Sequence, residues 1–166
     1  MVGWKYVFFL LLPLALQTAF FSHLPLFGVI PNLILIITVC YGLLKGTWPG
    51  LTFGLISGFC LDLAGSGILG INIIVMGVLG FGAGYLERMV FKDYLMVPIG
   101  AVLAGTVFGE LFSYCILLAF GWRIAFFSFL VSTLLPLCLY HLILTGPVYY
   151  GIKKGLNYLV RLKVGA

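Results

Sequence analysis

Charged side chains are scarce in this chain. They make up 8% of its 166 residues, whereas hydrophobic residues make up 63%, and the mean hydropathy is +1.25. A soluble domain of this composition would expose more apolar surface than water tolerates. Because a helix needs about 20 apolar residues to cross the hydrocarbon core of a bilayer, 166 residues hold about six crossings and little else. The composition therefore excludes a soluble domain and predicts one all-α, membrane-embedded unit over residues 1–166.

The residue sets that catalysis requires are also missing. The sequence has no Ser/His/Asp set, no H-E-x-x-H motif, no paired aspartates and no phosphate-binding loop with a lysine. The four cysteines lie in apolar runs, without metal-ligand spacing or an oxidising aqueous setting; they are Cys40, Cys60, Cys115 and Cys138. We therefore expect no enzyme, no metal site and no cofactor.

Transport signals are equally weak. A channel or secondary transporter usually shows a line of polar groups across the bilayer or a pair of broken helices. The polar residues of this chain are isolated from one another in the expected membrane segments. The residue pattern alone thus indicates a membrane protein that packs or binds.

Six apolar segments are expected to cross the membrane. They cover about residues 4–22, 31–44, 49–63, 69–86, 94–120 and 124–150. The first resembles a signal peptide but lacks a convincing A-x-A cleavage site, so we interpret it as a retained anchor. Residues 151–166 follow as a basic tail whose apolar and basic positions suit an amphipathic, interfacial helix.

The basic residues predict the orientation. Six crossings place both chain ends on one side, and that side receives all but one of the basic residues: Lys5, Lys45, Arg88, Lys92, Lys153, Lys154, Arg161 and Lys163. Arg123 alone falls on the other side. Because basic loops stay in the cytoplasm, both termini are predicted to be cytoplasmic. The net charge of +5 is therefore assigned to orientation and not to nucleic-acid binding.

The segment at residues 49–63 carries glycines in helical register. Gly50, Gly54 and Gly58 continue a four-residue spacing that begins at Gly42 and Gly46. Glycines four apart leave a groove in which another backbone approaches closely, which is a main source of helix association in membranes. The alternative is that glycine is simply common in membrane helices. We predict a packing or partner-binding groove here.

Three polar side chains in apolar surroundings are further candidates. Glu110 and His141 differ by about 10 Å in expected depth, so they are not predicted to pair. Glu110 is either protonated and hydrogen-bonded between helices or in contact with a partner or substrate, and His141 is expected to be a packing residue with satisfied hydrogen bonds. Asp62 is either an interfacial carboxylate that touches water or accepts bonds from the adjoining turn and the next helix N-terminus, or it makes a docking or ligand contact.

One part of the chain resembles a known family. The residues concerned are Ile30-Pro31-Asn32-Leu33-Ile34-Leu35, Tyr41-Gly42, Lys45-Gly46, Gly50, Gly54, Gly58, Leu61-Asp62-Leu63 and Gly70. They resemble the pattern of the bacterial rod shape-determining protein MreD family: a P-[DN]-L start, a glycine turn, glycines at four-residue steps and an L-D-L end. The motif covers about residues 30–85, and Asn32 stands where aspartate is common in the family.

The resemblance implies a function without catalysis. It implies a multi-pass scaffold of the cell-wall elongation complex in the bacterial inner membrane, which helps to control cell shape and peptidoglycan synthesis. Its direct partner would be the bitopic protein MreC, and its indirect partners would be MreB, RodA and the elongation transpeptidase. Under this interpretation Pro31, Asn32 and Asp62 shape the outer end near the partner, the tail contacts membrane lipid, and self-association is open.

A second class of binding protein is the alternative. In size and span count the family resembles the substrate-binding S components of energy-coupling-factor vitamin transporters, which implies an S-component-like fold. Those proteins carry small residues four apart on their first helix, and Ala15 and Ala19 have that spacing. The residues that could form a vitamin site are scattered along the chain: Asp62, Asn72, Tyr114, Trp122 and Arg123.

Overall fold

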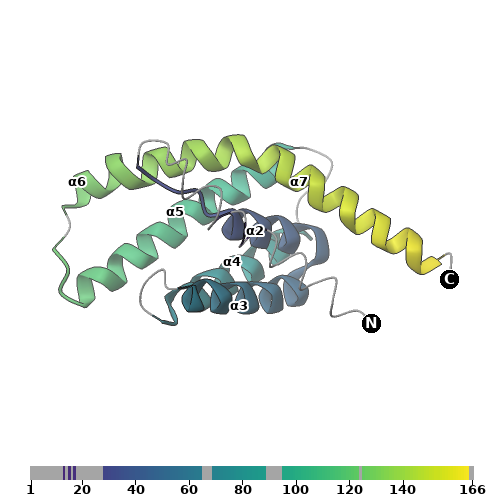
Figure 1. Ribbon diagram of the computed structural model, residues 1–166, viewed down its shortest axis with the longest axis horizontal. Helices are drawn as coiled ribbons and strands as arrows, with labels where there is room; N and C mark the ends of the chain where they lie inside the picture. Colours follow the sequence, from purple (N-terminus) through teal and green to yellow (C-terminus); the bar gives the residue numbers. More distant parts are fainter. Residues whose placement is uncertain are drawn as a thin grey trace.

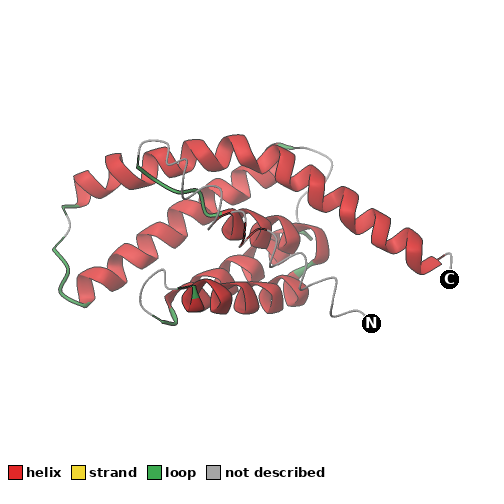
Figure 2. Cartoon of the chain, viewed as in Figure 1, coloured by secondary structure: helices red, strands yellow, loops and turns green. Residues whose placement is uncertain are grey.

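The computed structural model describes residues 28–64, 69–88, 95–123 and 125–164, together with Pro13, Ala15 and Gln17. Side chains are described as far as Leu156. The first expected membrane segment, residues 4–22, therefore lies almost wholly outside the described residues. Within the described ranges every regular element is a helix (Figure 2). The all-α prediction is confirmed for this part of the chain.

The helices divide into a cluster of three short ones and a pair of long ones (Figure 1). In chain order they are α2 (Leu33–Lys45), α3 (Thr47–Leu63), α4 (Ile71–Leu86), α5 (Met96–Ala119), α6 (Phe126–Phe129), the π-helical turn η2 (Leu130–Leu134) and α7 (Leu135–Val164). The long helix α5 and the α6–η2–α7 stretch form an antiparallel hairpin, which extends beyond one end of the α2–α4 cluster (Figure 1).

Glycines with positive φ make the tight turns between the short helices. Gly46 alone separates α2 from α3 at φ 92°, and Gly70 precedes α4 at φ 101°. A side chain is strained in this left-handed region, so glycine is the natural residue there. Pro49 lies in the first turn of α3, where its missing N–H costs no helical hydrogen bond.

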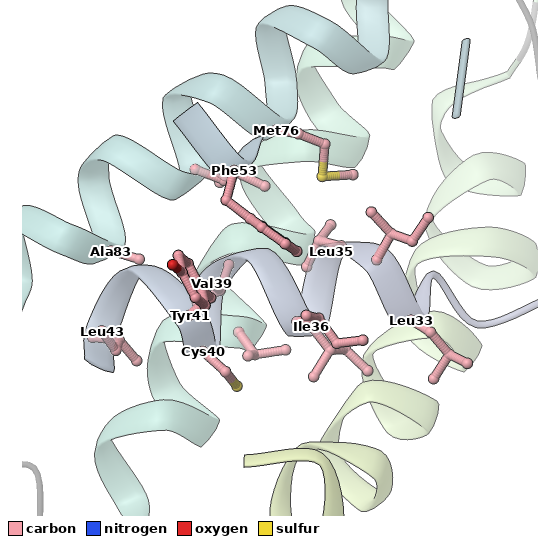
Figure 3. Packing of buried hydrophobic residues seen from close by; sticks show 14 of the residues in the cluster. Leu33, Leu35, Ile36, Val39, Cys40, Tyr41, Leu43, Phe53, Met76 and Ala83 are labelled. Atoms are coloured by element: carbon pink, nitrogen blue, oxygen red, sulfur yellow. The ribbon is translucent and has the colours of Figure 1, made fainter. Parts of the chain in front are cut away.

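Helix α2 forms the centre of the molecule. All its residues from Leu33 to Leu43 are buried. Helix α2 is therefore covered by the rest of the protein on every side, as a helix that is hydrophobic all round requires. Figure 3 shows how its side chains meet those of neighbouring helices, among them Phe53 of α3 and Met76 of α4. The ring of Tyr41 stacks on Phe53 at a centroid distance of 4.7 Å. Helices α3, α4, α5 and α7 therefore pack around α2 as a common core.

Two helical stretches in the described residues are long and apolar enough to cross a membrane, Met96–Ala119 and Phe126–Leu156. Leu33–Lys45 and Ile71–Leu86 are apolar but shorter. At 1.5 Å per residue, the 13 residues of α2 span about 20 Å, less than the hydrocarbon core of about 30 Å. The expectation of six crossings accordingly stays a prediction.

The last helix differs from the expected pattern. The pattern of the tail at residues 151–166 suits an interfacial helix after the sixth segment, and in the structure α7 continues without a break from Leu135 to Val164. Nothing in this stretch ends a helix, because Gly151 and Gly155 are absent from the positive-φ glycines of the chain and no proline follows Pro147. The basic tail is therefore the end of the same helix.

Candidate helix-packing and docking site

The glycines of α3 pack directly on the backbone of α4. A Cβ atom at Gly50 would overlap the carbonyl oxygen of Gly80, one at Gly54 would overlap that of Met76, and one at Gly58 would overlap that of Asn72. No side chain fits at these three positions unless the helices separate. Helix α4 of the same chain therefore covers the glycine face of α3.

Helix α4 contributes its own glycines to this contact. A Cβ atom at Gly80 would overlap the carbonyl oxygen of Gly50, and one at Gly84 would overlap that of Gly46. The interface is thus a reciprocal close approach of two backbones, in which small residues from both helices remove the steric barrier. Because both sides are occupied within the chain, this face is not open to a partner helix.

Asp62 lies at the end of α3 and binds the beginning of α4. Its Oδ2 accepts hydrogen bonds from the backbone N–H groups of Gly70 at 2.9 Å and Ile73 at 3.2 Å. Its Oδ1 accepts from Asn72, from the side-chain Nδ2 at 2.9 Å and from the backbone N–H at 3.3 Å. The carboxylate is 4% exposed. The geometry is that of a cap from a neighbouring helix, since the first N–H groups of a helix lack intrahelical partners and attract negative charge.

Asn32 makes an N-cap at the start of α2. Its side-chain Oδ1 accepts a hydrogen bond from the backbone N–H of Leu35 at 3.0 Å. This is the role for which asparagine and aspartate are preferred at helix starts. The neighbouring Pro31 is fully buried, and its carbonyl oxygen accepts a hydrogen bond from the backbone N–H of Leu33 at 3.2 Å.

His141 of α7 joins α2 to α5 through this N-cap. The imidazole is completely buried, and its Nε2 accepts a hydrogen bond from the backbone N–H of Asn32 at 3.1 Å. The other ring nitrogen, Nδ1, lies 2.6 Å from Oγ1 of Thr106. Since Nε2 accepts, a neutral ring carries its proton on Nδ1 and donates to Thr106. Thr106 then donates to the carbonyl oxygen of Val102 at 2.8 Å, so each polar atom has a partner.

Glu110 differs from these two residues. It lies on α5, one helical turn beyond Thr106, and is only partly buried. It does not share the hydrogen bonds of His141, whose ring nitrogens are taken by Asn32 and Thr106. The structure thus brings together Asn32 and His141 and, separately, Asp62 and Asn72, while Glu110 belongs to neither group.

Some residues that hold this arrangement carry no recognisable signal in the sequence. Thr106 and Asn72 are ordinary polar residues in apolar segments, and their roles depend on partners 35 and 10 positions away. The buried hydroxyls of Thr38 and Ser57, which lie 3.1 Å apart, join α2 to α3 in the same way. A search for small hydroxyl residues inside apolar helices would have selected Thr38, Ser57 and Thr106, though not their partners.

Within the described residues, the polar side chains of this site are engaged with one another and with helix ends. No group of three or more His, Cys, Asp or Glu side chains that could hold a metal ion occurs in that part of the chain. Asp62 accepts a hydrogen bond at the start of α4, and His141 bonds to the start of α2 and to Thr106. This part of the molecule therefore defines a helical membrane protein whose polar side chains fasten helices to one another.

Comparison with known families gives the chain a family. Residues 2–159 match the family of the rod shape-determining protein MreD, so the chain belongs to the MreD family. The match extends the resemblance at residues 30–85 to nearly the whole chain and supports a role in determining rod shape. No curated protein matches the chain, and no solved structure does. Nothing in these comparisons supports the vitamin-transporter alternative.

Proposed function

We propose that this protein is a non-enzymatic scaffold of the cell-wall elongation complex, built into the bacterial inner membrane by six crossings with both termini in the cytoplasm. Its direct partner is MreC, and through MreC it is linked to MreB, RodA and the elongation transpeptidase. The observation that carries the proposal is the family match over residues 2–159.

The use of the polar side chains supports a structural role. Intramembrane ionisable groups normally indicate ion paths or reaction centres, yet His141 and Asp62 hold helix N-termini in place. The α3–α4 glycine interface adds a close backbone contact along the length of these two helices. A rigid body with apolar outer surfaces is what a scaffold that positions other membrane proteins requires.

The exposed surface also fits a binding role. Large apolar side chains face outward on each of the longer helices, including Phe59 on α3, Phe81 on α4, Phe108 on α5 and Leu139 on α7. In a bilayer such surfaces contact lipid or the helices of other proteins. MreC, as a protein with one membrane helix, would use part of this surface.

The test is co-purification from native membranes. The tagged protein is extracted in mild detergent, and the proteins recovered with it are identified by mass spectrometry and compared with those of an unrelated multi-pass protein carrying the same tag. Recovery of MreC in near-stoichiometric yield, with RodA and the transpeptidase in lower yield, supports the proposal. Recovery of a transporter ATPase pair with its coupling subunit, and no MreC, would overturn it.

A further inference from the structure

The end of the molecule that holds the turn between α2 and α3 also holds the end of α4. Helix α2 ends at Lys45, and Gly46 follows as the N-cap of α3. A Cβ atom at Gly46 would lie 3.2 Å from Oε2 of Glu87, the residue that follows α4. Arg88 comes next in the chain, so Lys45 and Arg88 lie on either side of this contact.

Helix α7 reaches the same end of the molecule. Its His141 binds Asn32 at the start of α2, and from this contact both helices run in the same direction (Figure 1). Lys45 is 13 positions beyond Asn32, and Lys154 is 13 positions beyond His141. The rise along either helix is therefore about 20 Å. Ile152 packs in the core cluster that includes the last turns of α2, so Lys154 lies at about the level of Lys45.

Basic and aromatic side chains are paired at this level. Lys45, Arg88 and Lys154 are all exposed. Each has an exposed aromatic residue three or four positions away; these are Trp48, Tyr85 and Tyr150, with exposed fractions of 71%, 51% and 68%. Tyr150 and Lys154 share one face of α7, because residues four apart are neighbours on a helix. We call these six residues the basic–aromatic rim.

The spacing along α7 places the rim at a membrane surface. Phe127, beside the tip of the hairpin, is 76% exposed and lies 23 positions before Tyr150, a distance of about 35 Å. The large exposed side chains between them are apolar: Val131, Leu135, Leu139, Leu142 and Ile143. This length matches a hydrocarbon core of about 30 Å, with aromatic side chains at both boundaries. The basic side chains of the rim therefore fall among the lipid headgroups.

The rim presents positive charge outward. Its nearest acidic residue, Glu87, is only partly exposed, and its carboxylate lies against the N-cap of α3, where negative charge is favoured. The opposite end of the molecule differs in charge. The loop between Ala119 and Phe126 carries one basic residue, Arg123, beside the exposed Trp122.

We propose that the basic–aromatic rim binds anionic phospholipids of the membrane surface on which it lies. Lys45, Arg88 and Lys154 attract the phosphate groups, and the exposed rings contact the glycerol and upper acyl region, where tryptophan and tyrosine are favoured. Charge complementarity selects an anionic occupant, and the rings beside an apolar helix surface select one that carries acyl chains. This inference goes beyond the scaffold function and does not depend on MreC.

The experiment is quenching of tryptophan fluorescence by brominated lipids. The full chain is reconstituted in phosphatidylcholine bilayers as two proteins with a single tryptophan: Trp48 with Trp4→Phe and Trp122→Phe, or Trp122 with Trp4→Phe and Trp48→Phe. Brominated phosphatidylglycerol or brominated phosphatidylcholine then replaces a rising share of the lipid. We expect phosphatidylglycerol to be preferred about fivefold more strongly at Trp48 than at Trp122, the effect of one further basic residue near the surface.

Substitutions test whether the basic side chains hold the lipid. Lys45→Gln combined with Arg88→Gln should lower the preference at Trp48 to that at Trp122 or below it. Lys45→Arg combined with Arg88→Lys keeps both charges and should keep the preference. Thermal unfolding in detergent should be the same for these proteins, since both residues are exposed. If the double glutamine variant cannot be purified, Arg88→Gln alone should lower the preference at least twofold.

The remaining outcomes decide against the lipid site. Equal preferences at Trp48 and Trp122 overturn it, and so does a preference at Trp48 that the glutamine variants leave unchanged. Loss of the preference when glycerol 3-phosphate is added in excess identifies a soluble phosphate ligand instead. Absence of any preference at Trp48 leaves the rim to an acidic protein segment.

The lipid site and the scaffold function fail separately. If the wild-type protein recovers MreC from native membranes but shows no preference for phosphatidylglycerol at Trp48, the lipid site fails and the scaffold function stands. If the preference is present and no MreC is recovered, the scaffold function fails and the lipid site stands.

Discussion

Asn72 donates two hydrogen bonds to the carboxylate of Asp62, one from its side chain at 2.9 Å and one from its backbone at 3.3 Å. The two residues belong to adjacent helices, so the pair connects the end of α3 to the start of α4. The same helices meet through their glycines along the rest of their length. Stability of this helix pair should therefore depend on Asp62 and on the glycines together.

Replacement of Asp62 by alanine should destabilise the fold by about 2–3 kcal/mol, because several N–H groups at the start of α4 lose a charged acceptor. Denaturant unfolding in detergent measures this effect. Expression and MreC recovery should fall together, since the residue acts through the fold. A variant that is fully stable but loses MreC would instead indicate a direct contact.

Replacement of Gly54 by leucine should separate α3 from α4, because even a Cβ atom there overlaps the backbone of Met76. Gly54→Ala should cost about 2 kcal/mol or more, in the range of overpacked cores. The matched control is Gly82→Ala on α4, where no atom lies within 4 Å of the added carbon. The control should be neutral or stabilising by up to about 1 kcal/mol. Equal stability of Gly54→Ala and Gly82→Ala would contradict the close packing. Gly58→Leu should separate the helices in the same way as Gly54→Leu.

Replacement of His141 by leucine should cost about 1–3 kcal/mol, because the N–H of Asn32 and the hydroxyl of Thr106 lose their partner in a buried place. Glutamine can both accept and donate, so His141→Gln should recover part of the loss. Thermal unfolding of the wild-type protein and the two variants in the same detergent gives the order of their stabilities. If the leucine variant is as stable as the wild-type protein, the hydrogen bonds that link α2, α5 and α7 contribute no net stability.

The proposed topology predicts opposite labelling of two loops. In a variant without its native cysteines, a cysteine at Arg123 should react with a membrane-impermeant reagent in intact cells. A cysteine at Lys45 should react only after the membrane is opened. Labelling of both positions from the same side would exclude the proposed arrangement of crossings.

Much of the helical architecture follows from local sequence. Gly46 and Gly70 mark the turns that enclose α3. The position of Asp62 beside a glycine-rich turn allowed a cap for the following helix as one of two interpretations, the other being a docking or ligand contact. The four-residue glycine spacing likewise indicates a close helix contact. These signals can be read because each depends on neighbouring residues.

The long-range contacts could not be read in this way. His141 binds Asn32 across 109 positions of the sequence, and neither segment contains a pattern that indicates the other as its partner. The glycine spacing predicts a groove in α3 but leaves open whether α4 or another protein fills it. The continuous α7 was also missed, because its basic end has the composition of a surface helix.

The unequal lengths of the helices have a consequence for the surrounding lipid. The 17 residues of α3 and the 16 residues of α4 span about 25 Å, whereas the 24 residues of α5 span about 36 Å. In the proposed six-crossing topology, acyl chains beside α3 and α4 would thin by about 5 Å to match them. Next to α5 no thinning is required. The protein would thus carry a step in bilayer thickness around its own perimeter and favour neighbours whose membrane segments match either side.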